Sequence, residues 1–129
     1  LRARLPLLLP SAPLVLPPMC IAAFPSAAAA RVLVLELSRS ADLTALQERV
    51  ARLAGELGYP EERRPYRPHV TLARFSSPAA LGPAVFAERP LPSPAAAPAL
   101  ALYESRRDAT GAVYTPLASW PLPQRLAGA

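Results

Sequence analysis

The 129-residue chain alternates between short apolar runs and proline-rich breaks. Residues 31–37 are apolar at nearly every position, which is typical of a central strand buried on both faces. In residues 43–57, leucine and valine recur every three or four positions, which predicts an amphipathic helix. Ser40 or Asp42 can accept hydrogen bonds from the amides of its first turn, and Gly58 supplies a left-handed position at its end.

A second apolar pattern follows the helix. Residues 99–105 and 112–118 are expected to form two strands joined by a turn through residues 108–111, which would be an antiparallel hairpin. The order of strand, helix, strand and hairpin in so short a chain predicts an α+β fold, with a largely antiparallel sheet and one main amphipathic helix.

Proline breaks the rest of the chain into short pieces, because 18 prolines are spread along its length. Residues 1–9 are expected to be the tail of a helix. Residues 10–25 should form an extended connection with one short strand near 14–16. Residues 78–98 should be rich in loops, with a short strand near 85–86.

Composition limits the class of protein. A length of 129 residues suits one modest domain with a single core, and 52% apolar residues exclude a disordered chain. The net charge of +5 favours an anionic partner such as RNA, DNA or phosphate. Cys20 is the only cysteine, so neither an internal disulfide nor a cysteine metal site is expected, and the interpretation is a small buried or half-buried side chain.

The first residues imitate a secretory signal, because Arg2 and Arg4 precede a leucine-rich run. Prolines at several positions, Pro6 and Pro10 among them, interrupt this run, and no stretch reaches the ~20 unbroken apolar residues of a membrane span. We therefore expect a cytoplasmic protein with no membrane association. The chain does not begin with Met, which suggests that it starts within a longer protein.

The residues that suit a chemical reaction lie in residues 64–74, with the sequence Arg-Pro-Tyr-Arg-Pro-His-Val-Thr-Leu-Ala-Arg. Alternation from His69 onward predicts a strand with His69, Thr71 and Ala73 on one face, and with Arg74 on the other if the alternation continues. The imidazole and the hydroxyl then lie roughly 7 Å apart. The hydroxyl can donate to a phosphoryl oxygen while the imidazole exchanges a proton near neutral pH.

Arginine and tyrosine side chains in the same segment suit a nucleic-acid substrate. Four of the fourteen arginines fall within residues 63–74, and guanidinium groups match phosphate oxygens. Arg67 and Arg74 are therefore candidate phosphate-binding residues, and Tyr66 could stack on a base. The alternative is structural: a lone His-x-Thr occurs by chance in many strands, and an arginine-rich turn is usually a solvated surface.

Residues 64–74 resemble the second His-x-Thr motif of the 2H phosphoesterases, in particular the LigT-type RNA 2',3'-cyclic phosphodiesterases, also called 2'-5' RNA ligases. The flanks extend the likeness. Residues 31–37 and 43–57 are similar to the family strand and helix, and residues 102–105 and 111–117 carry Leu-Tyr-x-Ser and Tyr-x-x-Leu patterns of its closing hairpin. The resemblance covers about residues 10–122.

The resemblance implies an enzyme that opens RNA 2',3'-cyclic phosphate ends to 2'-phosphates without a metal or other cofactor. His69 and Thr71 would be the catalytic residues, and an RNA or oligonucleotide with such an end would be the partner. The implied fold is one lobe, plus part of the other, of the bilobal 2H phosphoesterase architecture.

The chain departs from this family in one respect, because the family carries two His-x-Thr motifs and the chain has a single histidine. Opening the cyclic phosphate needs a base and an acid on opposite sides of phosphorus, and one imidazole cannot hold both positions. We therefore expect residues 1–129 to be one partial domain, the C-terminal part of a LigT-like domain, with impaired activity alone. Two alternatives stay open: a non-catalytic remnant that binds RNA ends, and a small secreted basic protein.

Overall fold

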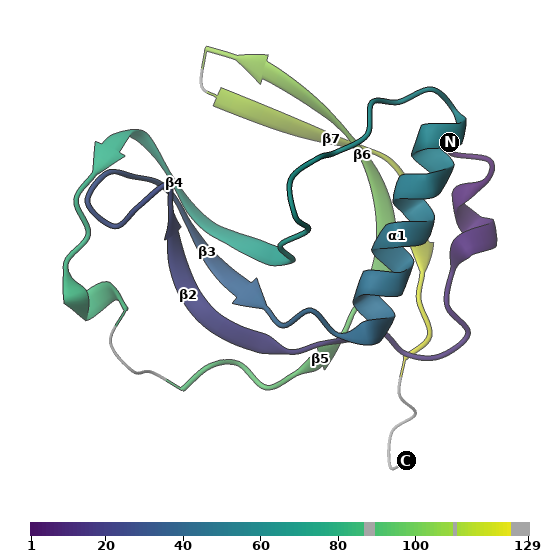
Figure 1. Ribbon diagram of the computed structural model, residues 1–129, viewed down its shortest axis with the longest axis horizontal. Coiled ribbons are helices and arrows are strands. Elements are labelled where there is room, and N and C mark those ends of the chain that lie inside the picture. Colours follow the sequence, from purple (N-terminus) through teal and green to yellow (C-terminus); the bar gives the residue numbers. More distant parts are fainter. Residues whose placement is uncertain (87–89, 110, 125–129) are drawn as a thin grey trace. The chain divides into compact units, whose positions relative to one another are not determined.

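The computed structural model describes residues 1–86, 90–109 and 111–124, and it has the expected α+β architecture (Figure 1). Its strands pair in antiparallel fashion in all the described sheets, and α1 is the main helix. The chain forms two compact units. The first comprises Leu1–Leu16, Ser40–Pro65 and the segment from Ala95 onward, and the second comprises Pro17–Arg39 and Tyr66–Pro94.

The second unit is built on a three-stranded antiparallel sheet in the order β2–β3–β4 (Figure 1). The strands are β2 (Pro18–Phe24), β3 (Ala30–Leu37) and β4 (His69–Ala79). The middle strand, β3, is the one predicted in residues 31–37, and its Val34 is fully buried at 0% exposed. A central strand covered on both faces accounts for the nearly unbroken apolar run.

Strand β2 is the main element that the prediction missed, because residues 10–25 were expected to be mostly an extended connection. Prolines lie at both ends of this strand, with Pro18 as its first residue and Pro25 directly after Phe24. Proline is tolerated at the first residue of a strand and on a sheet edge, and among the described residues β2 has β3 as its one neighbouring strand in the sheet. The apolar segment between the prolines is therefore free to pair.

The predicted helix is α1 (Ala41–Glu56), in the first unit. The Ser40 hydroxyl accepts a hydrogen bond from the Leu43 amide at 3.2 Å, which caps the first turn as expected. Gly58 follows the helix with φ of +91°, the left-handed conformation that glycine adopts without strain. The buried apolar side chains of this unit are Leu5, Leu14, Leu43, Leu46, Leu53, Ala97 and Leu122.

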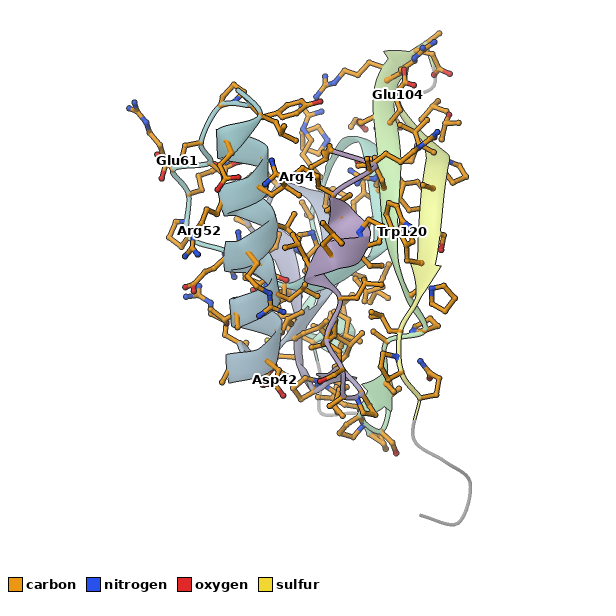
Figure 2. All side chains as sticks on the ribbon, turned by 90° about the vertical axis from the view of Figure 1, so that its right-hand side faces the viewer. Arg4, Asp42, Arg52, Glu61, Glu104 and Trp120 are labelled. Carbon is orange, nitrogen blue, oxygen red and sulfur yellow. The ribbon has the colours of Figure 1, made fainter. Side chains whose placement is uncertain are left out.

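The N-terminal segment packs against this helix. It contains a 3₁₀ helix, η1 (Leu5–Leu8), where a helix tail was expected, and η1 contacts α1. Arg4 lies beside α1 and forms an ion pair with Glu56 at 3.0 Å (Figure 2). No helix of the described residues is long and apolar enough to cross a membrane.

The predicted hairpin is present and longer than expected. It consists of β6 (Ala99–Asp108) and β7 (Gly111–Pro121), with Gly111 at φ of +116° where the second strand starts. The strand expected near 14–16 is β1 (Val15–Leu16), which pairs with β5 (Ala95–Ala96).

The prediction of a short strand near residues 85–86 is wrong. A 3₁₀ helix, η2 (Pro83–Val85), occupies this place. Pro83 is the first residue of η2, and its ring fixes φ near the helical value. The Val85 and Phe86 amides donate to Gly82 and Pro83 within the same turn, so the apolar pair has local hydrogen bonds instead of a partner strand.

Candidate functional site

The candidate site begins where the chain joins the sheet of the second unit. His69 is the first residue of β4 and lies opposite Glu36 of β3. Just before it, the buried Pro68 accepts a hydrogen bond through its carbonyl oxygen from the Leu37 amide at 2.9 Å. This bond fixes the backbone at the entrance to the strand, and with it the base of the histidine side chain.

The imidazole of His69 is exposed and has one defined partner. Its Nδ1 lies 2.7 Å from the carbonyl oxygen of Arg67. A carbonyl oxygen can only accept, so Nδ1 carries a proton in this contact. The other ring nitrogen, Nε2, is therefore the one that can accept a proton when the ring is neutral. This is the arrangement that a proton-transfer residue needs.

Thr71 shares the face of His69, as the alternation predicts. It lies opposite Val34 on β3, two residues from the position opposite His69. Cross-strand partners in an antiparallel pair project to the same face, so the two β4 side chains follow Glu36 and Val34. The exposed hydroxyl of Thr71 is thus available beside the imidazole.

The prediction for Ala73 and Arg74 is wrong, because β4 contains a β-bulge. Val34 pairs with Thr71 but Leu33 pairs with Ala73, which leaves Leu72 as an extra residue in β4. An extra residue reverses the alternation beyond it. Ala73 therefore lies on the opposite face.

Beyond the bulge, Arg74 lies opposite Val32 and shares the face of His69 and Thr71. This position suits the expected role of Arg74 in phosphate binding better than the opposite face, where simple alternation would place it. The arginine is exposed.

Sequence reasoning missed Glu36, a carboxylate near the end of the middle strand, β3, that is only 8% exposed. One carboxylate oxygen, Oε1, accepts from the Arg67 guanidinium in an ion pair, and Oε2 accepts from the Cys20 thiol at 3.3 Å. Burial works to raise the pKa of Glu36, but the hydrogen bonds from Cys20 and Arg67 and the nearby charge of His69 lower it overall. The signal in the sequence was a single carboxylate within a mostly apolar strand.

Arg67 was predicted to bind phosphate, and the structure gives it two partners inside the protein. Its guanidinium pairs with Glu36 and lies over the ring of Phe24, 4.3 Å from the centroid. Tyr66, the predicted stacking residue, is half-buried, and burial raises the pKa of its hydroxyl. The sheet thus brings Arg67 beside the site but directs it toward β2 and β3.

Cys20 is an exposed residue, so the expectation of a buried or half-buried side chain is wrong. It lies opposite Glu36 on β2, and its thiol donates to that carboxylate. Partial burial of the sulfur, the hydrogen bond to Glu36 and the negative charge of Glu36 raise the pKa of the thiol. This cysteine is therefore poorly ionised and acts as a hydrogen-bond donor.

Of the remaining arginines in the motif segment, Arg64 has a local partner. Its guanidinium pairs with Glu62 at 3.0 Å, and this contact lowers the pKa of Glu62 to about 2. The described residues contain no group of three or more His, Cys, Asp or Glu side chains arranged to hold a metal ion.

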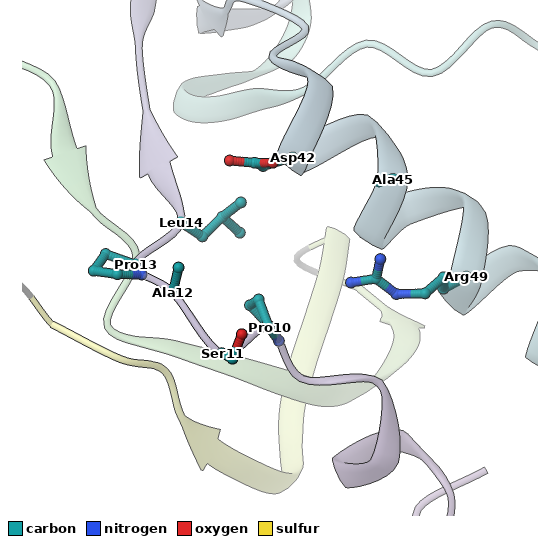
Figure 3. A pocket seen from close by; sticks show the side chains of 8 residues that line it. All are labelled: Pro10, Ser11, Ala12, Pro13, Leu14, Asp42, Ala45 and Arg49. Atoms are coloured by element: carbon teal, nitrogen blue, oxygen red, sulfur yellow. The ribbon is translucent and has the colours of Figure 1, made fainter.

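A separate pocket of about 270 Å³ lies in the first unit (Figure 3). It is formed by residues 10–14 together with Asp42, Ala45 and Arg49 of α1. Arg49 donates to the Leu8 carbonyl at 3.4 Å, which ties the helix to the N-terminal segment. None of the predicted site residues lines this pocket.

Comparisons with known proteins bear on the fold and the family of the chain. No curated protein matches the chain. A solved structure, that of TT0787 from Thermus thermophilus, is similar to it with a TM-score of 0.62 and 24% sequence identity. The similarity covers 97% of this chain and 70% of that one, and it establishes a shared fold. The family model of the 2'-5' RNA ligase superfamily matches residues 20–109, which is most of the chain and includes the whole of residues 64–74. The chain therefore belongs to the 2'-5' RNA ligase superfamily.

Proposed function

We propose that this chain contributes one catalytic half-site to an enzyme that hydrolyses RNA 2',3'-cyclic phosphate ends to 2'-phosphates. Membership of the 2'-5' RNA ligase superfamily implies an enzyme of the phosphoesterase or ligase type that acts on RNA. The observation that carries the finer proposal is the orientation of His69. Its Nδ1 is engaged by the Arg67 carbonyl, and Thr71 and Arg74 share its face.

The reaction divides the work between two proton-transfer groups. A base removes a proton from water as the water oxygen bonds to phosphorus. The bond from phosphorus to the 3'-oxygen breaks, and an acid protonates this leaving oxygen, which gives a 2'-phosphate and a 3'-hydroxyl. His69 supplies one of the two groups through Nε2. Because the chain has one histidine, the other comes from a second His-x-Thr motif or a second copy of the chain.

Binding of the phosphate falls to the groups around the imidazole. The Thr71 hydroxyl donates to a phosphoryl oxygen, and Arg74 supplies positive charge on the same face. Tyr66 stacks on the terminal base, and Arg67 contributes charge beside it. We propose that no metal ion or other cofactor takes part, and that the enzyme works in the cytoplasm on RNA.

A second candidate function is binding of RNA ends without catalysis. The single histidine favours it, because a lone imidazole leaves one side of phosphorus unattended. The two functions separate cleanly in one assay, in which an oligonucleotide with a 2',3'-cyclic phosphate end is incubated with the protein and both binding and ring opening are measured.

We expect the 129-residue chain to bind this end and to hydrolyse it very slowly. A protein in which the chain is joined to a second His-x-Thr segment should hydrolyse it well, with or without EDTA. In that protein, His69→Ala should slow turnover by roughly 10²–10⁴-fold. Thr71→Ala should slow turnover by roughly tenfold to a hundredfold, because it removes a hydrogen bond to a charged group.

Ser77→Ala, at another exposed hydroxyl of β4, is the matched control for Thr71→Ala and should change little. Full activity of the joined protein after His69→Ala would refute the assignment of His69. Binding without any hydrolysis by the joined protein would favour the RNA-end-binding function.

A further inference from the structure

We propose that Glu36 is a positioning residue for His69, which it orients through Arg67 so that Nε2 is presented to the substrate. The inference rests on the proposed function, since it assigns a role to Glu36 in that same site. It begins from a carboxylate that the motif does not contain and that lies directly opposite His69 in the sheet.

The first step is the way in which the carboxylate itself is held. Each of its oxygens has a different partner, with Arg67 on Oε1 and the Cys20 thiol on Oε2. Two partners on two oxygens fix the plane of the carboxylate as well as its position. A buried charge costs free energy unless it is paired and hydrogen-bonded in this way.

The second step is the way in which the carboxylate holds Arg67. The guanidinium is bound at its edge by Glu36 and at its face by the Phe24 ring, at 4.3 Å. Because the guanidinium at the end of the Arg67 side chain is bound, rotation of the Arg67 backbone is restricted as well. The neighbouring Pro68 is held as well, because its carbonyl accepts from the Leu37 amide at 2.9 Å. Two consecutive residues of β3, Glu36 and Leu37, therefore hold the two residues that precede His69.

The third step links Arg67 to the imidazole. The Arg67 carbonyl oxygen is the acceptor for Nδ1–H of His69, at 2.7 Å. The hydrogen bond made by one ring nitrogen determines which tautomer the ring adopts, and such orienting groups are a general feature of catalytic histidines. The direction of this carbonyl therefore decides whether Nε2 is free to accept a proton. Glu36 acts on the ring through the backbone of Arg67.

The chain offers an unusually direct test, because His69 is its only histidine. The ring nitrogen signals in a ¹⁵N NMR spectrum of the full chain therefore report on this residue alone. At a pH where the ring is neutral, we expect the wild type to show mainly the tautomer protonated at Nδ1. Glu36→Gln and Arg67→Gln should each raise the population protonated at Nε2 by about fivefold, which corresponds to roughly 1 kcal/mol for one hydrogen bond.

Non-additivity tests the route through Arg67. If Glu36 acts through Arg67, the double variant Glu36→Gln/Arg67→Gln should shift the tautomer no further than either single variant. Arg31→Gln is the matched control, because Arg31 is an exposed arginine of β3 at a position that alternates to the opposite face from Glu36. It should leave the tautomer unchanged.

Several results would overturn the proposal. One is a folded Glu36→Gln or Arg67→Gln protein with the wild-type tautomer, and another is an Arg31→Gln protein with the same shift as theirs. If Glu36→Gln fails to fold, Arg67→Gln decides alone, since its side chain is half exposed and leaves the buried residues in place. The spectrum needs no substrate, so the expected tautomers together with a joined protein that fails to hydrolyse the cyclic phosphate end would refute the proposed function and leave this inference standing.

Discussion

At the scale of single residues, Glu36 differs from the other charged groups of its sheet because it is buried and has a partner on each oxygen. His69 and Thr71 could be predicted because their motif is contiguous in sequence. Glu36 could not, because its place beside His69 follows from the pairing of β3 with β4. The sequence contains only the anomaly of a carboxylate in an apolar strand.

The lowered pKa of Glu36 predicts that acid weakens the fold at this residue. The pKa of Glu36 in the folded chain is lowered from the ordinary value of 4.5. The stabilising contribution is therefore present above this ordinary value and is lost as the pH falls through the folded pKa. Urea unfolding of the wild type and of Glu36→Gln should show a difference in free energy that shrinks in this acidic range. A difference independent of pH down to the lowest pH at which both fold would contradict the prediction.

At the scale of elements, predictability followed the range of the interactions. Helix α1 could be predicted, since the cap at Ser40 and the glycine at its end act within a few residues. The hairpin of β6 and β7 was predictable for the same reason. Strand β2 could not be, since its partner β3 supplies the hydrogen bonds. The bulge at Leu72 could not be predicted either, because the strand pairing, and not the local sequence pattern, decides which residue is left unpaired.

The bulge leads to a testable prediction about the role of Arg74 in binding. Because Arg74 shares the face of His69, Arg74→Ala should weaken binding of an RNA 2'-phosphate end roughly tenfold or more. Moving the arginine to position 73, in the double variant Ala73→Arg/Arg74→Ala, should not restore binding, because residue 73 lies on the other face. A simple alternating strand predicts the reverse. Arg31→Ala keeps the same loss of charge on the opposite face and serves as the control in a titration.

The end of α1 offers a matched pair of glycines. A Cβ added at Gly55 or at Gly58 meets no atom within 4 Å, so only backbone conformation separates the two. Gly58→Ala should destabilise the fold by about 1 kcal/mol, because φ of +91° is strained for alanine. Gly55→Ala, within the helix, should stabilise it by about 0.5–1 kcal/mol. Thermal unfolding of the two variants should move in opposite directions, and a shift in the same direction would refute the argument.

At the scale of the whole molecule, the sheet that holds the site also has exposed edges. In the order β2–β3–β4, strand β4 has one neighbouring strand among the described residues, and it exposes Val70 and Leu72 at 46% and 50%. An apolar edge strand is a template for pairing with another chain. The proposed catalytic face and the edge belong to the same strand, so pairing of two chains through β4 would bring two copies of His69 into one assembly.

We therefore expect the isolated chain to associate as its concentration rises. Leu72→Lys should reduce this association, because a charge on an edge strand opposes pairing with another chain. Leu7→Lys adds the same charge at a leucine that is 80% exposed but lies in the 3₁₀ helix η1 and not in a strand, and it should reduce association much less. Sedimentation velocity over a range of concentrations would measure both effects. A chain that stays monomeric at all concentrations would contradict the prediction. The rate of ring opening by the wild type can be measured over the same range of chain concentrations. If this rate rises with the square of the chain concentration and Leu72→Lys abolishes that rise, a second copy of His69 supplies the missing proton-transfer group.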